Sequence, residues 1–325
     1  MRHLGRRTVT ARTLIVLAAC SLFGVGPAGA VTLTFGYGEI GGSSVPTSIR
    51  NAFTTIGMEY DAIFTDTKII NIDVEFADIG AGNLGETNQT FDVIDYASWE
   101  TELKAKSSDG TQATADASLP SSAPVGNGFV VLSTANYQIL GGAPPLSAFT
   151  KGSDNVEYNA ELLFSSTASF FFGSSGSGYD FNSVAEHELD EALGTVSWVG
   201  QSGGYAAPVD FFRYQDSSGT RSFSSTPGTP AYFSLDGHNR LVQYNNSGSG
   251  DFGDFTGTCF VQNYAECPNT VADIANPGEP EITILNAVGY DIAVAPEPGT
   301  FALLGLGAAF AVARRHKRSS RPAAA

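Results

Sequence analysis

The chain has 325 residues, of which 42% are hydrophobic and 15% charged, enough for one large domain or two small ones. It contains 33 acidic residues against 17 lysines and arginines, giving a formal net charge of −16, and nine of the basic residues but only one acid lie in residues 1–30 and 296–325. Because so acidic a body repels nucleic-acid phosphates and favours cations, we exclude nucleic acid as a partner.

Residues 1–30 have the pattern of a secretory signal peptide. Four arginines precede an apolar run over 14–25, and Ala28-Gly29-Ala30 is a small-x-small cleavage site, so signal peptidase is an expected partner. The segment ending at Cys20 also matches a bacterial lipoprotein cleavage box. We favour cleavage after Ala30, because the apolar run continues past Cys20.

The body that follows mixes short strands and helices. Apolar residues recur at helical spacing over 49–64 and 96–106, and apolar and polar residues alternate over 70–76 as in a half-buried strand. Further strand-like runs occupy 31–37, 129–132, 160–166 and 169–172. After residue 194 the chain is mostly irregular, apart from a helix-like run over 282–288.

The stretch 183–194 predicts a helix with one polar face. Ser183 and Glu186 match a capping box at its start, and Gly194 is the expected stop. Between them, His187 and Glu191 are four residues apart and therefore share one face, roughly opposite the apolar side chains. These apolar residues form the expected buried stripe: Ala185, Leu189, Ala192 and Val196.

His187, Glu188 and Glu191 are the candidate site residues on this helix. An imidazole and a carboxylate one turn apart can bind one divalent metal, and Glu188 beside them can take a proton from metal-bound water. The pattern is the metalloprotease His-Glu-x-x-His helix with glutamate in place of the second histidine. The alternative is a polar helix face on which four acids surround one histidine.

A third ligand must come from elsewhere in the chain. Asp210 is the first candidate, because an unpaired carboxylate would be costly to bury in its aromatic segment; the alternative is an ion pair with Arg213. His238, in a turn, is the second candidate. Asp251 and Asp254 could offer oxygen ligands to calcium, but two acids do not make a cage, so we expect solvated turn acids there.

The donor types constrain the metal. Two carboxylates and one imidazole suit Zn²⁺, and they suit Mn²⁺ or Ca²⁺ better than three histidines would. A ligand carboxylate also weakens the metal as a Lewis acid, so we expect either a slow protease or a descendant without activity. Cys259 and Cys267, eight residues apart in an exported body, are expected to form a disulfide.

Residues 296–318 form a second processing element, followed by a tail over 319–325. Pro296-Glu297-Pro298 precedes thirteen mainly apolar residues and then the basic run 314–318. As a helix the apolar run spans about 20 Å, short of the roughly 30 Å hydrocarbon core. This order resembles the PEP-CTERM sorting signal, which implies recognition by an exosortase in a Gram-negative bacterium. The resemblance implies a transient inner-membrane anchor through 299–313, then delivery to the cell surface or extracellular matrix.

The body, residues 31–295, resembles a family of PEP-CTERM-associated metalloproteases. The similar stretches are 179–194, 209–214, 231–237, 250–255 and 285–291. The resemblance implies a metzincin-like α+β fold, in which a twisted mixed sheet packs on the metal-site helix and the C-terminal part is irregular. The sequence departs from metzincins at Glu191, where the second histidine belongs, and at Ser197, where the third ligand would follow Gly194.

Two functions therefore remain open. In the first, the protein is an exported zinc-dependent endopeptidase acting on a protein or peptide, with His187, Glu191 and Asp210 as ligands and Glu188 as general base. In the second, it is a non-catalytic acidic surface or matrix protein of exopolysaccharide-producing bacteria, in contact with cations or extracellular polysaccharide. Metal content separates the two.

Overall fold

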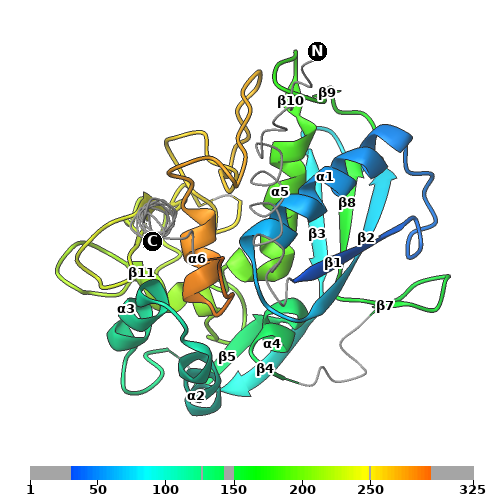
Figure 1. Cartoon of the computed structure of the whole chain (residues 1–325). Helices are drawn as coiled ribbons and strands as arrows, with labels where there is room; N and C mark the ends of the chain where they lie inside the picture. The colour runs from blue at the N-terminus through cyan, green and yellow to red at the C-terminus, as the bar shows by residue number, and fades with distance from the viewer. Residues whose placement is uncertain (1–30, 126, 143–149, 249, 294–325) are drawn as a thin grey trace, which may run out of the picture. The chain divides into compact units, whose positions relative to one another are not determined.

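A four-stranded mixed sheet lies beneath the predicted helix (Figure 1). We describe it from a computed structural model, which covers residues 31–125, 127–142, 150–248 and 250–293. The segments expected to be a signal peptide, a sorting signal with its helix, and a tail lie outside these residues. Within the described ranges, no helix is both long and apolar enough to cross a membrane.

The strand order places an antiparallel strand at one edge of the sheet. Strands β1 (Thr32–Tyr37), β2 (Ile69–Ala77) and β8 (Ala160–Ser165) run parallel, and β3 (Gly85–Gln89) pairs antiparallel with β8 at the end of the order β1-β2-β8-β3. The strand predicted over 70–76 is confirmed, and Ile70, Ile72 and Val74 are fully buried, but it is not half-buried as expected, because Asp73 and Glu75 on its other face are buried too.

Helices α1 (Thr47–Ile63) and α5 (Phe181–Asp190) pack against each other and against this sheet (Figure 1). Phe53 of α1, Phe164 of β8 and Phe181 of α5 form one aromatic cluster, with ring centroids 5.0–6.2 Å apart. Each ring is fully buried, which contributes about 2–3 kcal/mol per side chain relative to exposure. The core thus fixes α5 over the sheet and beside β3.

A second layer of structure packs below the end of α5. It contains an antiparallel pair of strands and three helices: β4 (Phe91–Asp95), β5 (Phe129–Ser133), α2 (Tyr96–Lys106), α3 (Gly110–Ser118) and α4 (Thr134–Ile139). Short strand pairs complete the first half of the chain: β6 (Thr150–Lys151), β7 (Glu157–Tyr158), β9 (Phe170–Phe171) and β10 (Tyr179–Asp180).

The C-terminal part contains little regular structure. After α5, a π-helical turn spans Glu191–Thr195 and a 3₁₀ helix spans Pro208–Phe212. Beyond them lie three short antiparallel strands and one helix: β11 (Arg213–Tyr214), β12 (Tyr232–Phe233), β13 (Val242–Gln243) and α6 (Glu281–Ala287). Buried rings hold these loops together, namely Phe212, Phe233, Tyr244 and Phe255.

The start of α5 differs from the prediction. The helix begins at Phe181, and its N-cap is Asp180, whose carboxylate accepts from the Ser183 N–H. Ser183 instead bonds the backbone of Ala272, and the Glu186 carboxylate accepts from the Ile274 N–H. The capping-box prediction was therefore wrong, because both side chains anchor the distant segment 272–274. Gly194, at φ 127°, does stand where the helical path ends.

Candidate functional site

His187 projects from α5 with its ring held in one orientation. The predicted apolar stripe is confirmed for Ala185, Leu189 and Ala192, which are at most 1% exposed, so the opposite face of α5 is turned to the site. The Nδ1 atom of His187 lies 3.0 Å from the carbonyl oxygen of Val261. When Nδ1 carries the proton and donates to that carbonyl, Nε2 keeps its lone pair for a ligand.

Nε2 of His187 faces two carboxylates. Glu191 Oε1 and Asp254 Oδ1 each lie 3.7 Å from it. One donor atom from each of the three residues lies within 4.8 Å of the other two. A tetrahedral zinc site with bonds of about 2.1 Å separates its ligand atoms by about 3.4 Å, so small side-chain adjustments would bring all three to one ion.

The side-chain amide of Gln262 bridges two members of this group, His187 and Asp254. Its Nε2 atom lies 3.3 Å from Nε2 of His187 and 3.2 Å from Oδ1 of Asp254, while its Oε1 accepts from the Thr195 hydroxyl. The amide thus makes contacts that a metal ion would make. Rotation of Gln262 would free the position, or turn its own oxygen toward it.

Glu188 lines the same cavity as the three donors. Its Oε2 accepts a 2.7 Å hydrogen bond from the Thr87 hydroxyl of β3. Burial raises the pKa of Glu188 to about 8, and the charge of Glu191 adds to the rise. At Gly85, also on β3, a Cβ atom would lie 2.3 Å from Glu188 Oε1, so glycine leaves the room that this carboxylate occupies.

The charges of the site raise the proton affinity of its members. Burial alone would lower the pKa of His187, but contact with Glu191 and the charges of Asp254 and Glu188 raise it well above the usual value. Burial raises the pKa of Asp254 to about 7. Negative charge is therefore crowded at the site, and binding of a proton or of a divalent cation would relieve it.

These residues open into a cavity of about 580 Å³. Its walls are residues 82–87, which include the start of the edge strand β3, one face of α5, and the two loops around 250–254 and 263–266. Six acids line it and no lysine or arginine does: Glu86, Glu188, Glu191, Asp251, Asp254 and Glu266. The acidic lining favours positive charge.

Asp210 does not join the cluster, which corrects the prediction of it as the third ligand. Its Oδ1 accepts from the Ser197 hydroxyl at 2.6 Å, and its Oδ2 accepts from the N–H groups of Trp198 and Ala207. Both oxygens therefore have local partners, a side-chain hydroxyl for Oδ1 and backbone N–H groups for Oδ2. The alternative ion pair is also absent among the described residues, because Arg213 donates to the carbonyl of Phe252 instead.

The remaining candidates separate clearly. His238 is exposed, and its Nδ1 atom lies 2.9 Å from the Ser217 carbonyl oxygen, outside the cluster. Asp254 was expected to be a solvated turn acid, but it is only 5% exposed and faces His187. Asp254 was therefore not predicted as the third donor, and neither were the contacts that Thr87, Val261 and Gln262 make with the site.

Two other acidic groups occur in the described part of the chain. Asp73 and Glu75 lie near Glu161, but their oxygens accept backbone N–H bonds from residues 39–43. Glu186, near Glu59 and Asp273, accepts from Ile274. These carboxylates fasten loops to the sheet and to α5.

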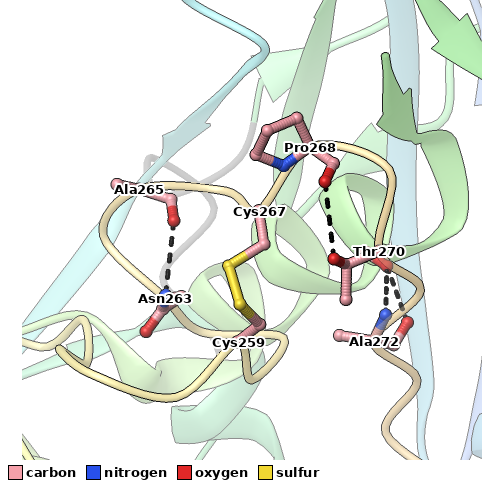
Figure 2. Close-up of a disulfide and its surroundings, with 8 residues drawn as sticks. Cys259, Asn263, Ala265, Cys267, Pro268, Thr270 and Ala272 are labelled. Atoms are coloured by element: carbon pink, nitrogen blue, oxygen red, sulfur yellow. Dashed lines mark hydrogen bonds between the residues drawn. A yellow bond between two sulfur atoms is a disulfide. The ribbon is translucent and has the colours of Figure 1, made fainter. Parts of the chain in front are cut away.

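The predicted disulfide between Cys259 and Cys267 is confirmed (Figure 2). It closes the loop that carries Val261 and Gln262 toward His187 and that also supplies cavity-lining residues. Figure 2 shows the sulfur bridge at the base of this loop, with Asn263 and Ala265 on the far side from the 268–272 segment. The cross-link therefore supports one wall of the site.

Comparison with protein families identifies one match, the PEP-CTERM protein-sorting motif, over residues 294–318. The match confirms the sorting signal predicted at this end of the chain. The protein is therefore an exported protein of the Gram-negative type, processed by an exosortase during export. Searches of curated proteins and of solved structures found no match for the chain.

Proposed function

We propose that the protein is an exported metal-dependent endopeptidase in which His187, Glu191 and Asp254 hold the metal. One observation carries the proposal: an imidazole nitrogen and two carboxylates converge in an open cavity that a third carboxylate, Glu188, also lines. Zn²⁺ is the first choice for these donors, with Mn²⁺ and Ca²⁺ as the alternatives that two oxygen ligands allow.

The proposed chemistry divides between the ion and the chain. A bound divalent cation polarises a water molecule and the carbonyl of a peptide bond. Glu188 takes the proton from that water and returns it to the leaving amine, and Thr87 keeps the carboxylate in place. The raised pKa of Glu188 suits a group that must both accept and release a proton near neutral pH.

The substrate position follows from the sheet. β3 is an edge strand, and residues 82–87 line the cavity beside His187 and Glu188. An extended peptide can add to such an edge through backbone hydrogen bonds. That placement would bring a peptide bond of the substrate past the donors, which supports an endopeptidase rather than a small-molecule hydrolase.

The second candidate function is an acidic surface or matrix protein without catalysis. It is favoured by the excess of acids in the body and by the sorting motif, which would deliver such a protein to the outer surface. Under this alternative, the site binds cations weakly, or the Gln262 amide stays in contact with His187 and Asp254 and no cation binds. Polysaccharide is then the expected partner.

Metal stoichiometry and peptide cleavage decide between the two. We expect wild-type protein to retain about one divalent ion after dialysis and to cleave a casein-derived peptide. Glu188→Gln should keep the ion and lose activity by about 10²–10⁴-fold, because the amide cannot accept the proton. Glu191→Gln should lose the ion, whereas His238→Gln, a histidine outside the cluster, should change neither property. Less than a tenth of an equivalent of metal in wild type would leave the matrix protein as the better account.

A further inference from the structure

The peptide group that joins Val261 to Gln262 is held at both ends. Its carbonyl oxygen accepts from Nδ1 of His187 at 3.0 Å, and its N–H donates to Oε1 of Glu281 at 2.8 Å. Val261, Gln262 and Glu281 are each at most 1% exposed. One rigid, planar group therefore connects a buried carboxylate to the ring of the candidate metal ligand.

We propose that Glu281 is a positioning residue of this metal centre, acting on His187 through the 261–262 peptide group. The proposal rests on the proposed function of the same site and names a residue that sequence reasoning did not identify. A metal-bound histidine commonly donates directly to a carboxylate. Here the 261–262 peptide group lies between the histidine and the carboxylate.

The mechanism of this coupling is electrostatic. A carboxylate that accepts the N–H bond draws the peptide hydrogen toward itself and increases the negative charge on the carbonyl oxygen, because chained hydrogen bonds polarise one another. The carbonyl then accepts more strongly from Nδ1–H of His187. A stronger bond at Nδ1 fixes the ring and makes Nε2 a better donor to a metal.

Burial of Glu281 needs an explanation that packing does not give. The side chain is fully buried at the first position of α6, and its second oxygen, Oε2, has no hydrogen-bond partner among the described residues. An unpartnered buried oxygen costs about 1–3 kcal/mol. The helix N-terminus offsets part of this cost, since negative charge is favourable there. Burial raises the pKa of Glu281 to about 8, and the hydrogen bond from the Gln262 N–H offsets part of this rise, so that bond favours the carboxylate form.

Glu279 provides a matched control. Burial raises the pKa of Glu279, and its interaction with the backbone N–H of Val261 offsets part of the rise. Glu279 therefore faces the same loop, but it acts on the preceding peptide group, whose carbonyl belongs to Phe260. Its side chain also contacts that of Glu281. A purely structural hold on the loop predicts similar effects at the two positions, whereas the proposed coupling predicts a clearly larger effect at Glu281.

The first test measures metal affinity of the full chain by competition with a chelator, using Zn²⁺. We expect Glu281→Gln, which keeps the size and one acceptor oxygen, to weaken Zn²⁺ binding about tenfold, the lower end for loss of an outer-shell partner. Glu279→Gln should change it less than twofold. Equal effects of the two variants, or none at Glu281, would overturn the proposal.

The second test does not depend on metal binding, and its first measurement uses the wild-type chain. In ¹⁵N-histidine spectra of the metal-free full chain above the pKa of His187, the ring should be the Nδ1–H tautomer. The signal is assigned by its absence from His187→Gln, since the chain also contains His3, His238 and His316. An Nε2–H tautomer would overturn the proposal. In Glu281→Gln the Nδ1 resonance should shift, while Glu279→Gln leaves it in place. If wild type binds no metal but shows this tautomer and shift, the coupling stands and the peptidase proposal fails.

Discussion

Asp254 Oδ1 lies 3.7 Å from Nε2 of His187, although a π-helical turn, a 3₁₀ helix and three short strands separate them in the chain. The relationship depends on the turn at 251–254, where Asp251 accepts from the N–H of Ser197 and so ties the turn to the end of the helical path. The third carboxylate of the site is therefore positioned by tertiary structure, not by spacing from the His-Glu helix.

The first prediction compares Asp254 with Asp210. Asp254→Asn should weaken metal binding by at least about tenfold, because an amide oxygen is a poorer ligand than a carboxylate. Asp210→Asn should leave metal binding unchanged but lower stability by about 1–3 kcal/mol, since it weakens a cap that serves Ser197, Trp198 and Ala207. Metal titration and urea unfolding of both variants measure this. The reverse pattern would restore Asp210 as the ligand.

The second prediction concerns the Cys259–Cys267 cross-link. A loop this short constrains the unfolded chain by about 2–3 kcal/mol, so reduction should lower the unfolding temperature without unfolding the protein at room temperature. Because the loop carries the Val261 carbonyl to His187, the double variant Cys259→Ser, Cys267→Ser should also bind metal less tightly. Unchanged metal affinity in the folded double variant would show that the loop keeps its position without the disulfide.

The third prediction is that rising pH changes the stability of the metal-free protein and of the metal-bound protein in opposite directions. His187 and Asp254 have raised pKa values in the metal-free fold, so their contribution to stability is present at low pH and is lost as pH rises through those values. Metal must displace these protons, so its apparent dissociation constant should fall at least about tenfold from pH 6 to pH 8. Melting temperatures with and without Zn²⁺ at several pH values measure both slopes. The difference in melting temperature between the protein with and without Zn²⁺ should increase with pH. A constant difference would contradict the assignment of His187 and Asp254 as ligands.

The fourth prediction concerns substrate charge. Glu266 lines the cavity, burial raises its pKa to about 7, and no lysine or arginine shares the lining. Peptides with lysine or arginine near the cleaved bond should therefore be preferred over those with glutamate. Glu266→Gln should reduce the preference about fivefold, the effect of an ion pair of about 1 kcal/mol. Cleavage rates of matched peptides give the ratio, and Glu161→Gln, an acid outside the cavity lining, is the control.

The sequence pattern was sufficient to predict a helix or strand where one hydrophobic periodicity determined that element. The spacing of Ile49, Phe53, Ile56 and Tyr60 predicted α1, and all four are buried as expected. The alternation over 70–76 predicted β2, but not the burial of Asp73 and Glu75, which accept backbone N–H bonds from residues 39–43. The polar segment that forms α3 gave no apolar period, and its helix depends on capping by Asp109, which accepts from Thr111 and Gln112.

The site was predictable only in part, for a physical reason. His187, Glu188 and Glu191 lie within two helical turns, so helix geometry alone brings them together. Asp254 and Gln262 reach the same point through loops whose path is set by buried rings and by the disulfide, and no local spacing encodes that path. Asp210 was misjudged because burial of a carboxylate in an aromatic segment is satisfied equally well by backbone N–H groups.

The position of the Gln262 amide allows the site to fold before it binds a metal ion. In the metal-free chain it joins Nε2 of His187 to Oδ1 of Asp254 and is itself steadied by Thr195, so the donors are bridged before any cation arrives. Folding and closure of the 259–267 loop can thus be complete first, and loading requires the turn of one side chain. The cation would be acquired where disulfides form, outside the cytoplasm, and the chain would cross the inner membrane without it.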